Sequence, residues 1–111
     1  MKYIKKFEDL SEEPEEGDYV IAYEEPHESY PQLLYDFVNN NAGLVVRKYE
    51  PKYSPVTLDV KYKNVPYELK HLYFFMDETK TVRSFPMDCI VEFAPTVKQL
   101  FAKITAKKYN I

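Results

Sequence analysis

Three residues of this 111-residue chain could take part in nucleophilic chemistry: Cys89, His27 and His71. A catalytic nucleophile needs a base beside it and a third group that orients the base. Cys89 lies in the apolar stretch MDCIVEF, which is typical of a buried, structural cysteine. Nothing in the sequence pairs it with either histidine. We therefore predict no catalytic residue and no enzymatic activity.

Metal and cofactor sites are also poorly supported. His27 lies among Glu24, Glu25 and Glu28, and imidazole with carboxylates can bind a divalent cation. The spacing matches no metal-binding motif, however, and the segment is predicted to be an exposed loop. With only 2 glycines and 1 cysteine, the chain has no glycine-rich phosphate loop, no internal disulfide and no cysteine-rich zinc site. We predict neither metal nor cofactor.

An acidic run between residues 8 and 18 is the first candidate binding surface. Like charges at this density repel one another and favour an exposed loop. We interpret residues 1–16 as an acidic N-terminal arm. The candidate contacts to a partner protein are Glu12, Glu13, Glu15 and Glu16. The alternative is a loop that only keeps the chain solvated.

Basic and aromatic residues alternate in the middle of the chain and form the second candidate surface. Basic groups interleaved with stacking aromatics are typical of proteins that bind single-stranded nucleic acid. The candidates are Arg47, Lys48, Tyr49, Lys61, Tyr62 and Lys63. A sequence pI of about 5.4 and the acidic arm argue against this function, because both oppose binding to phosphates.

Charge is distributed unevenly along the sequence. Residues 1–41 contain 3 Lys and 11 Asp or Glu, whereas residues 42–111 contain 12 Lys or Arg and 7 Asp or Glu. Such asymmetry can mark a polar interaction surface. It can equally mean that the two halves fold against each other and attract. The sequence leaves both interpretations open.

The pattern of apolar residues predicts a mainly β protein with two helices. Tyr and Phe are abundant and favour strands. We expect strands at residues 19–23, 44–49, 56–62, 81–85 and 87–93, with residues 67–76 as a loop leading into a strand. A short helix is expected at about residues 30–39. A C-terminal helix is expected at about 96–107, where Thr96 and Gln99 form a capping box.

These elements predict an α+β fold built on a small, five-stranded, SH3-like β-barrel. The whole chain is expected to be one domain, with the barrel at residues 17–93 and the C-terminal helical segment at 94–111. The short helix is an insertion in the barrel. The predicted core consists of Val20, Ala22, Leu34, Phe37, Val38, Leu44, Val46, Leu58, Val60, Phe74, Ile90, Phe93, Leu100, Phe101 and Ile104.

Three stretches carry a resemblance to a known group of proteins: GDYVIAYEE, YDFVNNNAGLVVRKY and VTLDVKYKNVPYELK. Their order resembles that in small uncharacterised proteins of large DNA phages and related viruses, over residues 17–93. The segment order also looks like that of an SH3-like barrel. The resemblance implies a phage-encoded protein acting in the host cytoplasm, and it implies no particular activity.

The favoured function is a non-enzymatic protein-interaction module, such as a phage accessory or inhibitor protein, with a protein as partner. The alternative is a small barrel that binds single-stranded nucleic acid. No stretch approaches the roughly 20 apolar residues of a membrane span, so we expect no membrane partner. A single cysteine suits a reducing compartment, and we expect a cytoplasmic protein.

Overall fold

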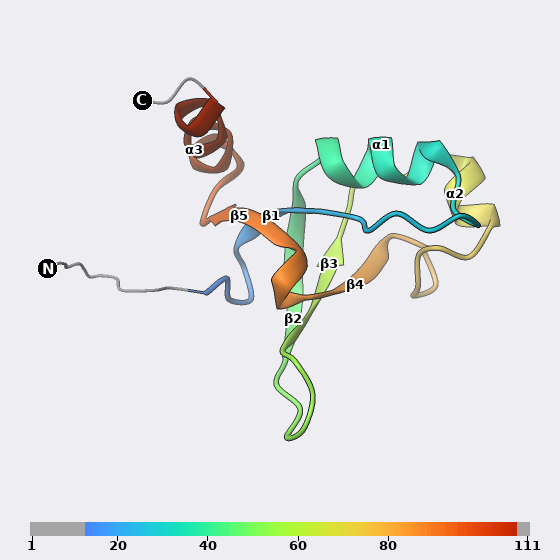
Figure 1. Cartoon of the computed structure of the whole chain (residues 1–111), viewed down its shortest axis with the longest axis horizontal. Coiled ribbons are helices and arrows are strands. Elements are labelled where there is room, and N and C mark those ends of the chain that lie inside the picture. The colour runs from blue at the N-terminus through green and yellow to red at the C-terminus, as the bar shows by residue number, and fades with distance from the viewer. Residues whose placement is uncertain (1–12, 109–111) are drawn as a thin grey trace, which may run out of the picture.

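The computed structural model describes residues 13–108, which form a five-stranded antiparallel sheet and three α-helices (Figure 1). The strands are β1 (Tyr19–Ala22), β2 (Gly43–Tyr49), β3 (Thr57–Lys61), β4 (Val82–Pro86) and β5 (Ile90–Ala94). The helices are α1 (Gln32–Asn40), α2 (Tyr67–His71) and α3 (Val97–Lys108), and a 3-10 turn, η1 (Met87–Cys89), joins β4 to β5. The predicted α+β composition and strand number are confirmed.

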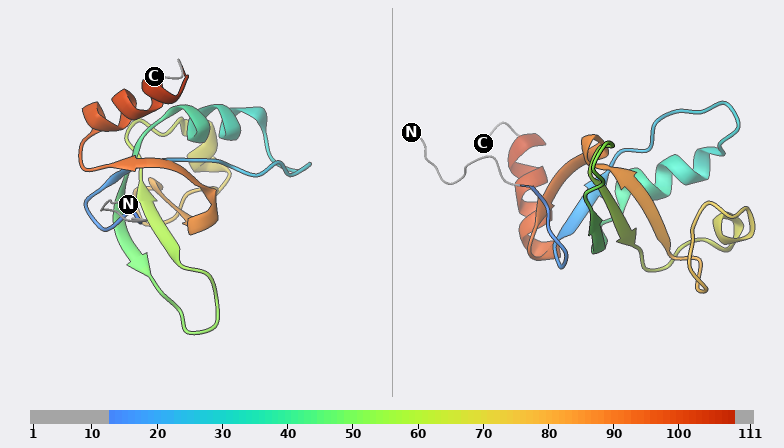
Figure 2. Two further views of the ribbon diagram at one scale, coloured as in Figure 1. Left: turned by 60° about the vertical axis from the view of Figure 1, so that its left-hand side comes forward. Right: turned by 90° about the horizontal axis from the view of Figure 1, so that it is seen from below.

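The strand order in the sheet is β4-β3-β2-β1-β5, and every neighbouring pair is antiparallel. Strands β2, β3 and β4 follow one another as a meander, while β1 and β5 add to its other side. The loop between β2 and β3 extends far from the rest of the molecule (Figures 1 and 2). At opposite ends of the molecule lie α3, beside β5, and α2.

The connection from β4 to β5 shows that the sheet is strongly curled. These strands occupy opposite edges, which would lie about 19 Å apart in a flat sheet of this width. The three residues of η1 cannot span that distance. Met87 N donates to Val56 O at 2.8 Å, and Tyr23 N donates to Cys89 O at 2.7 Å, so η1 connects the two sides.

The predicted barrel closure is not found. Among the described residues, no ladder of hydrogen bonds joins β4 to β5, and the sheet remains open between these two edges. The physical reason is the short η1 connection, which lies between the two edges. Its backbone is hydrogen-bonded to Tyr23, just after β1, and to Val56, just before β3. Besides its pairing with β3, β4 forms a single isolated bridge, between Val82 and Met76.

The main core lies between the curled sheet and α1. Leu34, Phe37 and Val38 share one face of α1 and are buried, as the apolar stripe predicts. A smaller cluster forms where Leu100 of α3 packs on Ile21 of β1 and Ala94 of β5. Across the described part of the chain, no helix combines the length and apolar character that crossing a membrane requires.

Two predicted core residues are exposed. Val46 is 42% exposed, because Val45 faces the core opposite Val60 and successive side chains of a strand point to opposite faces. Phe101 is 43% exposed and lines a hollow between α1 and α3, since α3 contacts the sheet mainly through Leu100. Five other predicted core residues are only half-buried at the margin: Leu44, Phe74, Ile90, Phe93 and Ile104.

Local boundaries differ in three places. Residues 67–76, expected to be a loop leading into a strand, begin with the helix α2, whose Leu69 is fully buried. No strand follows in this segment, which has only the bridge between Met76 and Val82. Phe75, not Phe74, then fills the core. The two expected helices are each shifted toward the C-terminus, to Gln32–Asn40 and Val97–Lys108.

Candidate functional site

Residues 13–18 of the acidic run form a turn bonded to β2, while residues 1–12 of the predicted arm lie outside the described residues. Asp18 N donates to Glu15 O at 3.0 Å, and Glu15 N donates to the Asp18 carboxylate at 2.9 Å. Gly17, with φ of +96°, allows this tight turn. Gly17 N donates to Val45 O, and Val45 N donates to Asp18 O, both at 2.9 Å. The glutamates of this turn are exposed, as predicted for the acidic run, and the turn is hydrogen-bonded to the sheet.

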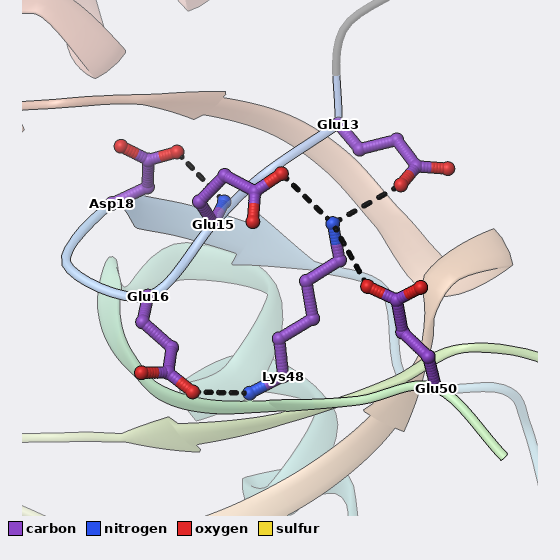
Figure 3. Close-up of polar contacts among 6 residues, drawn as sticks. All are labelled: Glu13, Glu15, Glu16, Asp18, Lys48 and Glu50. Carbon is purple, nitrogen blue, oxygen red and sulfur yellow. Dashed lines mark hydrogen bonds and ion pairs between the residues drawn. The ribbon is translucent and has the colours of Figure 1, made fainter.

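Lys48 is the point at which this turn and β2 meet (Figure 3). Its ammonium lies 2.9 Å from the carboxylate of Glu15, 3.1 Å from that of Glu13 and 3.9 Å from that of Glu50. The Lys48 backbone N–H donates to Glu16 Oε2 at 3.1 Å. Only 8% of the Lys48 side chain is exposed. Burial works to lower the pKa of Lys48, but the hydrogen bonds and charges of Glu15 and Glu13 outweigh it and raise that pKa.

This cluster keeps a large excess of negative charge. The carboxylates of Glu13, Glu15 and Glu50 approach the Lys48 ammonium, whereas Glu16 accepts from the Lys48 backbone N–H and Asp18 from Glu15 N (Figure 3). These carboxylates outnumber the one ammonium, so the group keeps a formal excess of negative charge. Three of the predicted partner-binding residues, Glu13, Glu15 and Glu16, belong to it. The fourth, Glu12, lies outside the described residues. The structure thus brings together candidates that the sequence only placed in a run.

A groove of about 550 Å³ begins at the same acidic turn. Its lining includes three acidic residues, Glu13, Glu15 and Asp18. Lys103 of α3 and the segment Phe93, Ala94 and Pro95 at the end of β5 also line it. We call this hollow the acidic groove. Apolar side chains next to carboxylates can accommodate the methylene stem and the charged end of a Lys or Arg side chain.

The candidate nucleic-acid residues do not form one surface. Arg47 lies 4.0 Å from the Asp59 carboxylate and 5.1 Å above the Tyr49 ring, while Lys48 is covered by glutamates. Tyr62 is 2% exposed, and its ring packs against Phe37 and Phe75, so it cannot stack on a base. The two others, Lys61 and Lys63, are exposed and lie elsewhere.

Lys61 and Lys63 line a separate cleft of about 470 Å³, which we call the basic cleft. It forms where the end of β3, the beginning of β2 and the beginning of α3 meet. Ala42, Leu44 and Val97 give it an apolar lining, and Asn41, Asn64, Tyr19 and Tyr62 complete it. Its lining contains no acidic residue and shares none with the acidic groove.

The best-formed ion pair, between Arg83 and Glu24, was not predicted from the sequence. Arg83 Nε and Nη2 donate to the two Glu24 carboxylate oxygens at 2.7 and 2.9 Å, and Nη1 donates to Phe74 O at 2.6 Å. Glu24 is 8% exposed. Burial works to lower the pKa of Arg83, but the hydrogen bond and charge of Glu24 raise it. Both groups are fully engaged, so the pair links two parts of the chain and leaves no reactive group.

The surroundings of Cys89 and His27, the residues considered for catalysis and metal binding, are those of structural side chains. Burial, followed by the nearby charge of Glu25, raises the pKa of the Cys89 thiol, which disfavours the reactive thiolate. His27 Nδ1 accepts a hydrogen bond from Ser29 N at 3.0 Å, and its ring stacks on Tyr30 at 4.7 Å. Within residues 13–108, no three His, Cys, Asp or Glu side chains are grouped so that they could hold a metal ion.

Comparison with known proteins found no matching protein-family model, no matching curated protein and no matching solved structure. Function must therefore be inferred from the side chains and surfaces of this chain. The two hollows of opposite charge, the acidic groove and the basic cleft, are the features with a defined chemistry.

Proposed function

We propose that the protein is a non-enzymatic interaction module that binds a basic segment of a partner protein in the acidic groove. The observation that carries the proposal is the placement of Glu13 and Glu15, which hold Lys48 and also line the groove. Their side chains are already ordered before a partner arrives, so binding orders few additional groups.

The chemistry of the acidic groove suits a Lys or Arg flanked by an apolar residue. The stem and the apolar neighbour would pack on Phe93 and Pro95, while the charged end meets the carboxylates. Excess negative charge around Lys48 would also attract a basic partner over some distance and speed association. The same charge repels a phosphate backbone, which disfavours nucleic acid at this place.

We further propose that the sheet is an SH3-like barrel that is left open. The strand order, the β2-β3-β4 meander and the 3-10 turn before β5 support this relationship. The curl imposed by η1 supports it as well, since both sides of the sheet bond to that turn. The proposed fold and the proposed function are independent, because fold alone does not determine function.

Selection of peptides from a random displayed library tests the proposed function. Selected peptides should be enriched in Lys or Arg beside an apolar residue. Their affinity should fall by about tenfold or more in the E13Q/E15Q double variant, because two of the groove's charges are removed. It should also fall with added salt, which screens exposed charges. Fluorescence anisotropy with a labelled peptide measures both effects.

The matched control is E68Q/E78Q, which removes two exposed carboxylates from α2 and from the turn before β4. This variant should bind like the unmodified protein, and circular dichroism should show that both double variants are folded. Selected peptides without basic residues, or equal binding by E13Q/E15Q, would refute the proposal.

A further inference from the structure

The basic cleft has a charge character that the proposed protein-binding function does not use. Lys61 and Lys63 form no ion pair with any carboxylate in residues 13–108. By contrast, Lys48 and Lys107 are each held by glutamates at 2.8 to 2.9 Å. Lys61 does lie close enough to Asp77 for its charge to help lower the pKa of that carboxyl, but neither lysine is held in an ion pair with a described residue. Two ammonium groups that line one concave site attract an anion.

The first turn of α3 adds to the positive character of the basic cleft. Val97, the first residue of this 12-residue helix, lines the cleft. Thr96 Oγ1 accepts from Gln99 N at 3.1 Å, as the predicted capping box requires, and no acidic side chain lies in the first turn. The helix dipole and the remaining backbone N–H groups at this end therefore favour a negative group beside the lysines.

Whether the basic side chains are lysine or arginine indicates which kind of anion the cleft prefers. Carboxylates are recognised best by the planar fork of arginine, whereas lysine serves as a point charge for phosphate. The basic cleft contains two lysines and no arginine. A phosphate dianion between Lys61 and Lys63 would balance both charges.

The rest of the lining indicates what the phosphate is attached to. Ala42, Leu44 and Val97 offer an apolar surface for a flat ring. Asn41 and Asn64 offer amide groups, and one Asn41 donor is already bonded to Phe37 O at 2.8 Å, which fixes that side chain. Amide side chains can hydrogen-bond the edge of a nucleobase through a donor and an acceptor.

We propose that the basic cleft binds a nucleotide, with its phosphate at Lys61 and Lys63 and its base on the apolar lining beside the two asparagines. The ligand can come from two sources with the same chemistry, a free mononucleotide or the phosphorylated end of a single strand. This inference does not depend on the acidic groove, because the two hollows share no residue.

Titration of the full chain with adenosine monophosphate, followed by amide chemical shifts and calorimetry, tests the proposal. Saturable shifts are expected at Ala42, Leu44 and Val97. Adenosine without phosphate, and inorganic phosphate alone, should each bind about tenfold more weakly or worse, since each keeps only half of the contacts. Oligothymidine with and without a terminal phosphate distinguishes the two sources.

Three variants separate a site from general attraction. K61Q/K63Q should weaken binding of adenosine monophosphate by about tenfold or more, whereas K52Q/K70Q, which removes two lysines outside the cleft, should leave it unchanged. Val97→Phe fills the cleft without altering charge and should also weaken binding. Circular dichroism checks that each variant is folded.

The outcomes decide the proposal in both directions. Tighter binding of the phosphorylated strand supports a strand end as ligand, and preference for the mononucleotide supports a free nucleotide. No saturable binding, equal binding of adenosine and its monophosphate, or unchanged binding by K61Q/K63Q would overturn the proposal. Inorganic phosphate binding as tightly as the nucleotide would overturn the role of the base.

Discussion

At the scale of single residues, the buried polar groups differ in whether they have hydrogen-bond partners. Arg83 and Glu24 satisfy each other with paired hydrogen bonds, and Arg83 lies 5.9 Å from each of the rings of Tyr30, Phe74 and Phe85. Tyr62 is the contrast, because its hydroxyl is buried and has no hydrogen-bond partner among the described residues. Burial, with the charge of Glu24, raises the pKa of Tyr62.

Tyr62→Phe is expected to leave the free energy of unfolding unchanged or to raise it by up to about 1 kcal/mol, because it removes an unsatisfied buried hydroxyl while keeping the ring. Urea-induced unfolding measures the effect. Tyr23→Phe, at a 46% exposed side chain, is the control and should be neutral. A loss of stability on Tyr62→Phe would mean that the hydroxyl has a partner, such as an internal water.

At the scale of elements, the β5 edge is protected by side chains from β5 and α3. Phe93 N donates to Glu92 Oε1 at 3.1 Å, and Lys103 Nζ donates to Phe93 O at 2.8 Å. Glu92 also binds Lys107 Nζ at 2.8 Å. These contacts fasten α3 to the strand and occupy backbone groups that could pair with another chain.

Glu92→Gln is expected to lower the free energy of unfolding by about 0.5–1 kcal/mol at neutral pH. Partial burial works to raise the pKa of Glu92, but bonds from Lys107 and Phe93 N outweigh it and lower the pKa below the usual 4.5. A lowered folded-state pKa stabilises the fold above about pH 4.5, and this contribution disappears as pH falls through the folded value.

The difference between the unmodified protein and Glu92→Gln should therefore shrink in acid, where both side chains are uncharged. Urea unfolding at neutral and acidic pH provides the measurement, with Glu78→Gln on an exposed turn as the control. An equal deficit at both pH values would show that the lysine contacts do not contribute through charge.

At the scale of the whole molecule, the uneven charge of the sequence is partly explained by pairing within the fold. Lys48 with Glu13 and Glu15, and Arg83 with Glu24, all join the acidic first part of the chain to the basic remainder. Mutual attraction of the two halves, one of the two interpretations, is thus observed. This pairing does not neutralise all of the charged side chains, because the acidic groove and the basic cleft each keep an excess of one sign.

Lys48→Met tests how this attraction contributes to stability. We expect a loss of about 1–2 kcal/mol at low salt, because the surrounding carboxylates lose their shared cation and repel one another. The loss should be smaller at high salt, which screens that repulsion. Lys52→Met, in the exposed loop between β2 and β3, should have little effect in either condition. Equal losses at both salt concentrations would attribute the effect to packing alone.

Much of the local structure could be predicted from the sequence because its causes are local. Thr96 and Gln99 mark the beginning of α3, and the apolar stripe of α1 marks its buried face. Runs of β-branched and aromatic residues located the five strands to within a few residues. The acidic run could also be recognised in the sequence, but the hydrogen bonds that attach it to β2 could not be predicted.

Tertiary structure alone decided the phase of β2, the closure of the sheet and the identity of the two hollows. Val46 faces solvent because Val45 is the residue that packs inward opposite Val60, and β4 and β5 remain unpaired because η1 lies between them. Lys48 meets Glu15 across 33 positions of sequence, and Arg83 meets Glu24 across 59. No sequence period records such encounters, since they depend on how distant segments pack together. For that reason the sequence by itself determined which residues could bind, and the fold decided which of them share a site.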